Sequence, residues 1–202
     1  MNQARESILK NIRQGCDEEV VKSLVEDFVV EDLGESLICS FINKLESVAG
    51  TVELIPNAKE IPFVVSEFLQ LHNLPQKVVV DARLKSLPWP NKLRLAFRAA
   101  QADDVVSVCS AFAGIAETGS VVLLSSPDSP TTLNFLPDNH IVILRKDNLV
   151  AQIEEVWGRL DSMPRSINII TGPSRTADIE QTLQLGAHGP RRLHVILVDR
   201  CA

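Results

Sequence analysis

The sequence predicts an α/β protein built on an open, mostly parallel sheet with helices on both faces. Two observations predict this fold class: short, continuously apolar runs bounded by turn-forming residues, and stretches of helical periodicity that alternate with them. A central strand of a parallel sheet is buried on both sides, so it is apolar without interruption. With 202 residues, 45% of them hydrophobic, the chain is long enough to bury a substantial core.

Residues 1–30 are predicted to form a helix and an arm that precede an α/β domain at 31–202. Apolar residues recur on one side of a short helix over Asn2–Arg13. The following segment, Cys16–Val30, mixes acidic residues with valines and has no clear period. It is interpreted as an extended arm.

In the first half of the domain, a helix and a strand alternate twice. Helical spacing of apolar residues runs from Leu33 to Gly50, and the glycine marks the end of that helix. A strand is predicted at Thr51–Ile55 and a second helix at Phe63–Leu71. The β-branched run Lys77–Asp81 predicts a buried parallel strand.

The second half continues the alternation, with an irregular Pro-rich connection at Pro127–Asn139. Long loops of this kind often carry function. The predicted elements are helix Asn91–Ala102, strands Asp104–Cys109, Ser120–Ser125 and His140–Leu144, helix Leu149–Leu160, strand Ser166–Ile170, helix Arg175–Leu185 and strand Leu193–Val198.

The charge pattern argues against a nucleic-acid partner. The formal net charge is -6 and the pI is about 5.3, and Lys and Arg are scattered along the chain. Binding to a phosphate backbone needs a clustered basic surface. The pair Arg191-Arg192 is interpreted as solvated surface.

No uncharged apolar run approaches the roughly 20 residues of a membrane span, and the N-terminus does not resemble a secretion signal. We therefore expect a cytoplasmic protein without a membrane partner. Its four cysteines are far apart and form no Cys-x-x-Cys pair, so we expect reduced thiols and no metal site built by this chain alone.

The first segment that could carry chemistry is Gly114–Ser120, which leads into a predicted strand. Glu117 is the leading candidate for a reactive group, because the glycine beside it lets the backbone come close to a ligand. Thr118 and Gly119 complete the candidate ligand site. The alternative is that Glu117 caps a turn or forms a salt bridge.

The second segment is Thr171–Glu180, at the end of a predicted strand. If a helix begins there, the backbone N–H groups near Gly172 lie at the positive end of its dipole and favour an anion. Ser174, Arg175 and Thr176 supply further donors. The pattern is neither a Walker A loop nor a dinucleotide fingerprint, and a helix cap alone would explain its hydroxyl groups.

The third segment places His188 between two glycines, in the loop before the final strand. Such a histidine is accessible and can transfer protons near neutral pH, so it is a second candidate catalytic residue. Alternatively it is a solvated residue that stabilises a turn.

Three segments together resemble the LUD domain family of lactate-utilization proteins, over roughly Val78–Asp199. The long second segment is the most specific of them. The matching segments are Ala116-Glu-Thr-Gly119, Leu136-Pro-Asp-Asn-His140-Ile, and Thr171-Gly-Pro-Ser-Arg-Thr-Ala-Asp-Ile-Glu180 followed by Gly186-Ala-His-Gly-Pro190.

The resemblance implies a part in oxidising L-lactate to pyruvate, in a three-protein system whose other members carry the iron–sulfur clusters. This chain would be the cluster-free component, with those iron–sulfur proteins as partners. The family's fold is similar to that of sugar-phosphate isomerases and CoA transferases, in which a glutamate set like Glu117 attacks an acyl group. The alternatives are a binding or sensor module for a small carboxylate or sugar phosphate, and an acyl-transfer enzyme that uses Glu117.

Overall fold

The computed structural model describes residues 6, 34–177, 183–185 and 189–200. The predicted N-terminal helix and arm thus lie outside the described residues, apart from Glu6, and the described part of the domain begins at Gly34. None of the described helices is both long and apolar enough to cross a membrane.

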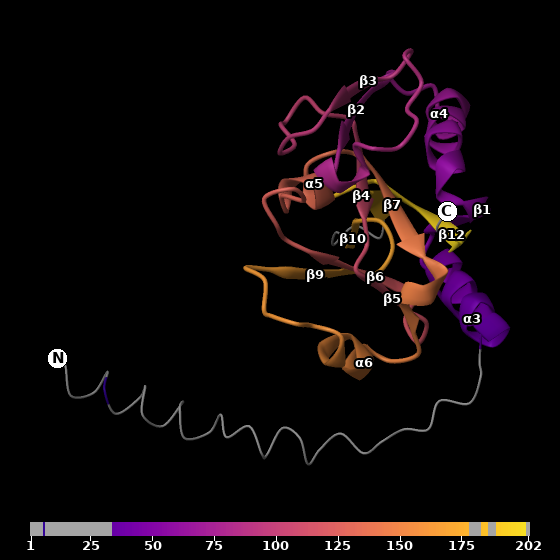
Figure 1. Ribbon diagram of the computed structural model, residues 1–202, viewed down its shortest axis with the longest axis vertical. Coiled ribbons are helices and arrows are strands. Elements are labelled where there is room, and N and C mark those ends of the chain that lie inside the picture. Colours follow the sequence, from indigo (N-terminus) through magenta and orange to yellow (C-terminus); the bar gives the residue numbers. More distant parts are fainter. Residues whose placement is uncertain (1–5, 7–33, 178–182, 186–188, 201–202) are drawn as a thin grey trace. The chain divides into compact units, whose positions relative to one another are not determined.

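The core of the domain is a six-stranded sheet in which every neighbouring pair of strands is parallel (Figure 1). The spatial order is β1-β12-β7-β4-β2-β3. The predicted α/β class with a mostly parallel sheet is confirmed. The strands are β1 Thr51–Asn57, β2 Lys77–Val80, β3 Arg94–Ala96, β4 Val106–Ser110, β7 Asn139–Arg145 and β12 Arg192–Arg200.

A second, four-stranded sheet has the order β8-β5-β6-β9. Its pairs β5–β6 and β6–β9 are antiparallel, whereas β5–β8 is parallel. Two further strands, β10 and β11, form an antiparallel pair of their own. These strands are β5 Ala113–Ile115, β6 Ser120–Leu124, β8 Leu149–Val150, β9 Ile167–Ile170, β10 Arg175–Ala177 and β11 Leu183–Leu185.

The helices follow the predicted periodicity in the first half of the domain. The described α-helices are α3 Gly34–Ser47, α4 Ile61–Leu71, α5 Thr132–Phe135 and α6 Ile153–Gly158. Helix α4 has Pro62 in its first turn, where the missing N–H costs no hydrogen bond. Helix α5 lies within the predicted irregular connection, and short 3₁₀ turns occupy Ala58–Glu60, Ala82–Leu84 and Lys146–Asn148.

The two faces of the parallel sheet bury separate sets of side chains, because alternate residues of each strand point to opposite sides. Val142 and Leu144 of β7 pack against α3, α5 and the second sheet. Ile141 and Ile143 of the same strand pack against α4 and the segment around Trp89. Helices therefore contribute to both faces, and the second sheet completes one of them.

The predicted helix Asn91–Ala102 is wrong. This segment contains the short edge strand β3, which pairs with β2. Leu93, Leu95 and Phe97 alternate with polar or small residues and all pack into the core on the α4 side. A period of two fits a strand, and it prevails over the helical propensity of the lysine, arginines and alanines.

The predicted helix Arg175–Leu185 is also wrong, because β10 and β11 at its two ends pair with each other. Arg175 lies opposite Leu185, so hydrogen bonds between strands replace those within a helix. The predicted helix Leu149–Leu160 is shorter than expected, since Leu149 and Val150 form β8 and the helix begins at Ile153.

Candidate functional site

His140, near the start of β7, is the most unusual polar residue of the core. Its side chain is 1% exposed, and neither ring nitrogen has a hydrogen-bond partner among the described residues. Burial lowers the pKa of His140 to about 3. At neutral pH the ring is therefore uncharged, with one nitrogen as donor and the other as acceptor. Leaving a buried polar atom unpaired costs about 1–3 kcal/mol, which a bound ligand would recover.

Two further buried polar atoms lie on elements next to His140. Ser107 of β4 is its register partner in the sheet, and Asn134 belongs to α5, which contacts both β4 and β7. Within the described part of the chain, neither the Ser107 hydroxyl nor the Asn134 Oδ1 has a hydrogen-bond partner. Apolar cores rarely contain three unpaired polar groups so close in the fold.

His140 lines a cavity of about 350 Å³ at the amino end of the parallel sheet. The polar part of its wall comes from the turn between β9 and β10, which supplies Thr171, Ser174 and Arg175. The remaining lining residues are Phe135, Ile169, Ile170, Gly172, Pro173, Gly189, Pro190 and Leu193.

A chain of hydroxyl groups connects this turn to the first candidate segment. The Thr118 and Ser120 hydroxyl oxygens are 2.6 Å apart, and the Ser120 and Thr171 hydroxyl oxygens are 2.5 Å apart. The third segment adjoins the same turn, because the Ser174 N–H donates to the Pro190 carbonyl at 2.8 Å. The described parts of all three segments thus meet at one place.

The glycines of the first two segments have a structural role in this meeting. Gly119 and Gly172 both have positive φ, at 68° and 75°. A Cβ on Gly119 would lie 2.4 Å from the backbone nitrogen of Leu45, and one on Gly172 would lie 2.8 Å from the carbonyl oxygen of Val48. Both turns therefore pack against the C-terminal end of α3 and the residue that follows it, and this contact by itself requires a glycine at position 119.

Of the predicted site residues, Gly172, Ser174 and Arg175 line the cavity. Their backbone does not begin a helix, so the expected helix dipole is missing and Arg175 remains as the cationic group. The other predicted residues are placed as follows: Glu117 and Thr118 are exposed on the turn before β6, Thr176 lies in β10, and His188 is outside the described residues.

His140 and Thr171 are the lining residues that the sequence analysis did not single out. Both belong to segments that carried the family resemblance. For His140, a signal was available: a histidine on an otherwise continuously apolar strand has to be buried with its polar atoms paired to something.

The arrangement suits a small molecule with an anionic oxygen group. A neutral imidazole offers one donor and one acceptor, the hydroxyl groups can do either, and Arg175 supplies a positive charge. Such polar groups set into an apolar wall fix the orientation of a ligand. Among the described residues, no group of three or more His, Cys, Asp or Glu side chains could hold a metal ion.

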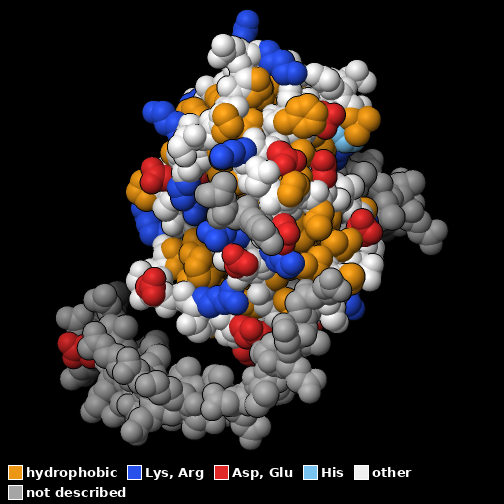
Figure 2. Space-filling view, turned by 45° about the vertical axis from the view of Figure 1, so that its right-hand side comes forward, with side chains coloured by type: hydrophobic (Ala, Val, Ile, Leu, Met, Phe, Trp, Pro, Cys, Tyr) orange, Lys and Arg blue, Asp and Glu red, His pale blue; other side chains and the backbone are white. Residues whose placement is uncertain are grey.

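The face of the molecule in Figure 2 carries Lys and Arg side chains interspersed with Asp and Glu, without a continuous basic surface. This face therefore has no clustered basic surface of the kind that binds a phosphate backbone. The absence of a nucleic-acid partner remains a prediction from the sequence.

Comparison with known proteins gives one family match and several relatives. Residues 38–198 match the LUD domain. The uncharacterized protein YkgG of Escherichia coli is 28% identical over 171 residues, covering 81% of this chain and 74% of that protein. Lactate utilization protein C of Anoxybacillus flavithermus is 38% identical over 89 residues, and that of Halalkalibacterium halodurans is 37% identical over 115 residues.

The two lactate utilization proteins are matched over part of their length. The alignments cover 43% and 53% of this chain, and 40% and 49% of those relatives. A solved structure, the crystal structure of a DUF162 family protein from Deinococcus radiodurans, superposes with a TM-score of 0.61 at 21% identity. The superposed region covers 82% of this chain and 98% of the Deinococcus radiodurans chain, and it supports the fold assignment.

Proposed function

Because this chain belongs to the LUD domain family, we propose that it takes part in L-lactate utilization and binds the lactate or pyruvate of that process in the His140 cavity. The family predicted from the three segments is confirmed, and relatives named lactate utilization protein C supply the link to lactate. The single observation that carries the proposal is the buried, unpaired His140 on the wall of a polar cavity.

A 2-hydroxy acid has two polar groups, and the cavity offers a suitable partner for each. Its carboxylate pairs with the Arg175 guanidinium, and its hydroxyl group with the neutral ring of His140. The methyl group of lactate fits the apolar remainder of the wall, which includes Ile170 and Leu193. Pyruvate keeps the carboxylate but has a carbonyl group in place of the hydroxyl group. That carbonyl oxygen can accept a hydrogen bond from the protonated ring nitrogen of His140.

The oxidation of lactate to pyruvate releases two electrons and two protons. In this proposal the electrons pass to iron–sulfur clusters of partner proteins, and this chain contributes binding and orientation. The neutral His140 ring would accept a hydrogen bond from the lactate hydroxyl group and so orient it, while both electrons pass to the partner proteins and both protons are released to solvent. We propose both the partner proteins with their clusters and the direction of the reaction, from lactate to pyruvate.

The test is calorimetry and thermal shift of the purified chain with L-lactate, D-lactate and pyruvate. A ligand that binds the native state raises the melting temperature. We expect L-lactate or pyruvate to do so, and His140→Leu and Thr171→Val to abolish the shift. The matched control is Thr131→Val, because Thr131 pairs with Ser166 away from the cavity. If neither acid binds the chain, alone or with its partners, the proposal is wrong.

A sensor module for a small carboxylate would use the same cavity. Measuring turnover distinguishes such a sensor from a component of the lactate-oxidising system. A component of the oxidising system supports lactate-dependent reduction of an electron acceptor once its partners are added, and His140→Leu slows it. A sensor binds the acid with no such dependence. Acyl transfer by Glu117 remains a separate prediction, which Glu117→Gln tests by loss of transfer from an acyl-CoA.

A further inference from the structure

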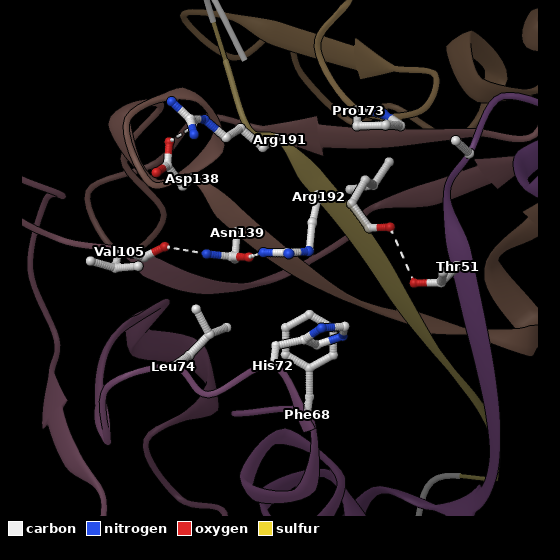
Figure 3. A pocket seen from close by; sticks show the side chains of 12 residues that line it. Thr51, Phe68, His72, Leu74, Val105, Asp138, Asn139, Pro173, Arg191 and Arg192 are labelled. Atoms are coloured by element: carbon white, nitrogen blue, oxygen red, sulfur yellow. Dashed lines mark hydrogen bonds and ion pairs between the residues drawn. The ribbon is translucent and has the colours of Figure 1, made fainter. Parts of the chain in front are cut away.

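A second, larger cavity of about 570 Å³ lies beside the first and shares Pro173 and Leu193 with it (Figure 3). It opens where β1, β7 and β12 begin and α4 ends. The proposed lactate site makes no use of it. The lining residues relevant to its chemistry are Arg191, Arg192, Asn139, Asp138, His72 and Phe68.

Arg192 is held in position by a buried amide. Its Nη1 donates to the Asn139 Oδ1 at 3.0 Å, and the Asn139 Nδ2 donates in turn to the Val105 carbonyl at 3.1 Å. Asn139 is 1% exposed, so this support is fixed in the core. Within the described ranges, Arg192 forms no ion pair with a carboxylate, which leaves its charge free for another anion.

Aromatic rings form the opposite side of the cavity. The Phe68 ring lies 4.4 Å from the ring of His72 and 4.8 Å from that of His194, measured between centroids. Figure 3 shows the rings of Phe68 and His72 below the Arg192 guanidinium. The pKa of His72 is lowered, mainly by burial and to a smaller extent by the positive charge of Arg192. The charge of Arg192 is therefore felt at the aromatic side of the cavity.

The charges of the cavity favour an anion. Arg191 pairs with Asp138 at 3.6 Å, and both side chains are more than half exposed. Among the described residues that line the cavity, Arg192 is therefore the cation without a carboxylate partner. A preorganised guanidinium recognises carboxylate or phosphate oxygens, and the flat aromatic surface beside it suits the ring or chain that carries them.

We propose that this cavity is a second ligand site, which binds an organic anion with its carboxylate or phosphate on Arg192 and its apolar part along Phe68 and His72. The site is distinct from the His140 cavity and takes a larger molecule. Its proximity to the first cavity allows both to be occupied together, with Pro173 and Leu193 as the wall between them.

The test uses benzoate and phenyl phosphate as probes, with benzyl alcohol as the uncharged counterpart. The full chain contains four histidines, so their ring signals are resolved in a two-dimensional NMR spectrum, and His72→Asn assigns the His72 signal. We expect one or both anions to shift that signal in a saturable manner, and the stronger binder identifies carboxylate or phosphate as the preferred group.

Arg192→Gln should weaken the bound probe at least tenfold, because it removes the charge while keeping a hydrogen-bond donor. Arg94→Gln is the matched control, since Arg94 is exposed on edge strand β3 and is not part of the cavity lining, and His140→Leu controls for the first cavity. Both controls should bind like the native chain. The proposal is overturned if neither anion shifts the His72 signal, if benzyl alcohol binds equally well, or if Arg192→Gln has no effect.

Discussion

Replacing Gly119 by alanine tests whether the first motif serves the fold or a ligand. The added Cβ would lie 2.4 Å from the Leu45 nitrogen and 2.7 Å from the Lys44 carbonyl carbon, both backbone atoms that no side-chain rotation can move. The residue would also retain a φ of 68°, which alanine disfavours by about 1–2 kcal/mol. Overpacking adds about 1–3 kcal/mol, so we expect Gly119→Ala to lower the free energy of unfolding by about 2–5 kcal/mol.

The assay is urea unfolding followed by circular dichroism. At a slope of about 2 kcal/mol per molar urea, this loss lowers the midpoint by roughly 1–2.5 M. The control is Gly158→Ala, because a Cβ on Gly158 has nothing within 4 Å. Its effect should stay within about 0.5 kcal/mol. If Gly119→Ala is as stable as Gly158→Ala, the contact with α3 is not what requires the glycine, and a ligand's close approach becomes the better explanation.

Three further results are expected. Leu144→Ala should lower the free energy of unfolding by about 2–5 kcal/mol in the same urea assay, because Leu144 is fully buried and its loss leaves a cavity; a change below 1 kcal/mol would contradict this packing. His140 and His194 have folded pKa values of about 3 and about 4, below the ordinary 6.5, so the unfolded chain binds more protons and stability should fall as the pH drops below 6.5, by at most about 1.4 kcal/mol per pH unit for each ring. In urea titrations at several pH values, His140→Leu should flatten that dependence, and an unchanged slope would refute its cause. Asp104→Asn should lower the melting temperature at pH 7, because the hydrogen bond from Arg98 stabilises the charged carboxylate and lowers the pKa of Asp104. The difference in melting temperature between the variant and the native chain should become smaller as the pH falls below 3.8. A difference that does not change with pH would show that the ion pair is not its cause.

The fold class followed from the sequence because the central strands carry their signal locally. Lys77–Val80 and Asn139–Arg145 are apolar runs that only a doubly covered sheet can bury, and they lie where they were predicted. The edge strand β3 was missed, since its three residues sit among helix-favouring lysine, arginine and alanine and its partner β2 lies earlier in the chain. The pairing of β10 with β11 likewise depends on a contact between residues ten apart, Arg175 and Leu185, which propensity does not record.

The candidate site was predicted in part. The motif residues Gly172, Ser174 and Arg175 do line the His140 cavity, and the hydroxyl chain from Thr118 to Thr171 connects the first motif to the second. His140 was missed because its apolar strand indicates that the ring is buried, but not whether its nitrogens find partners within the protein. That property depends on the side chains contributed by β4, α5 and the turn after β9, which the fold brings together from distant parts of the chain.

The contact of two glycine turns with the end of α3 limits how the length of this chain can change during evolution. Gly119 lies against Leu45 in the last turn of α3, and Gly172 lies against Val48 just after that helix. A one-residue insertion earlier in α3 would rotate these positions by about 100° and remove both contacts at once. The exposed connection between α6 and β9 carries no such constraint. Insertions and deletions among homologues should therefore accumulate in that connection and be rare in α3.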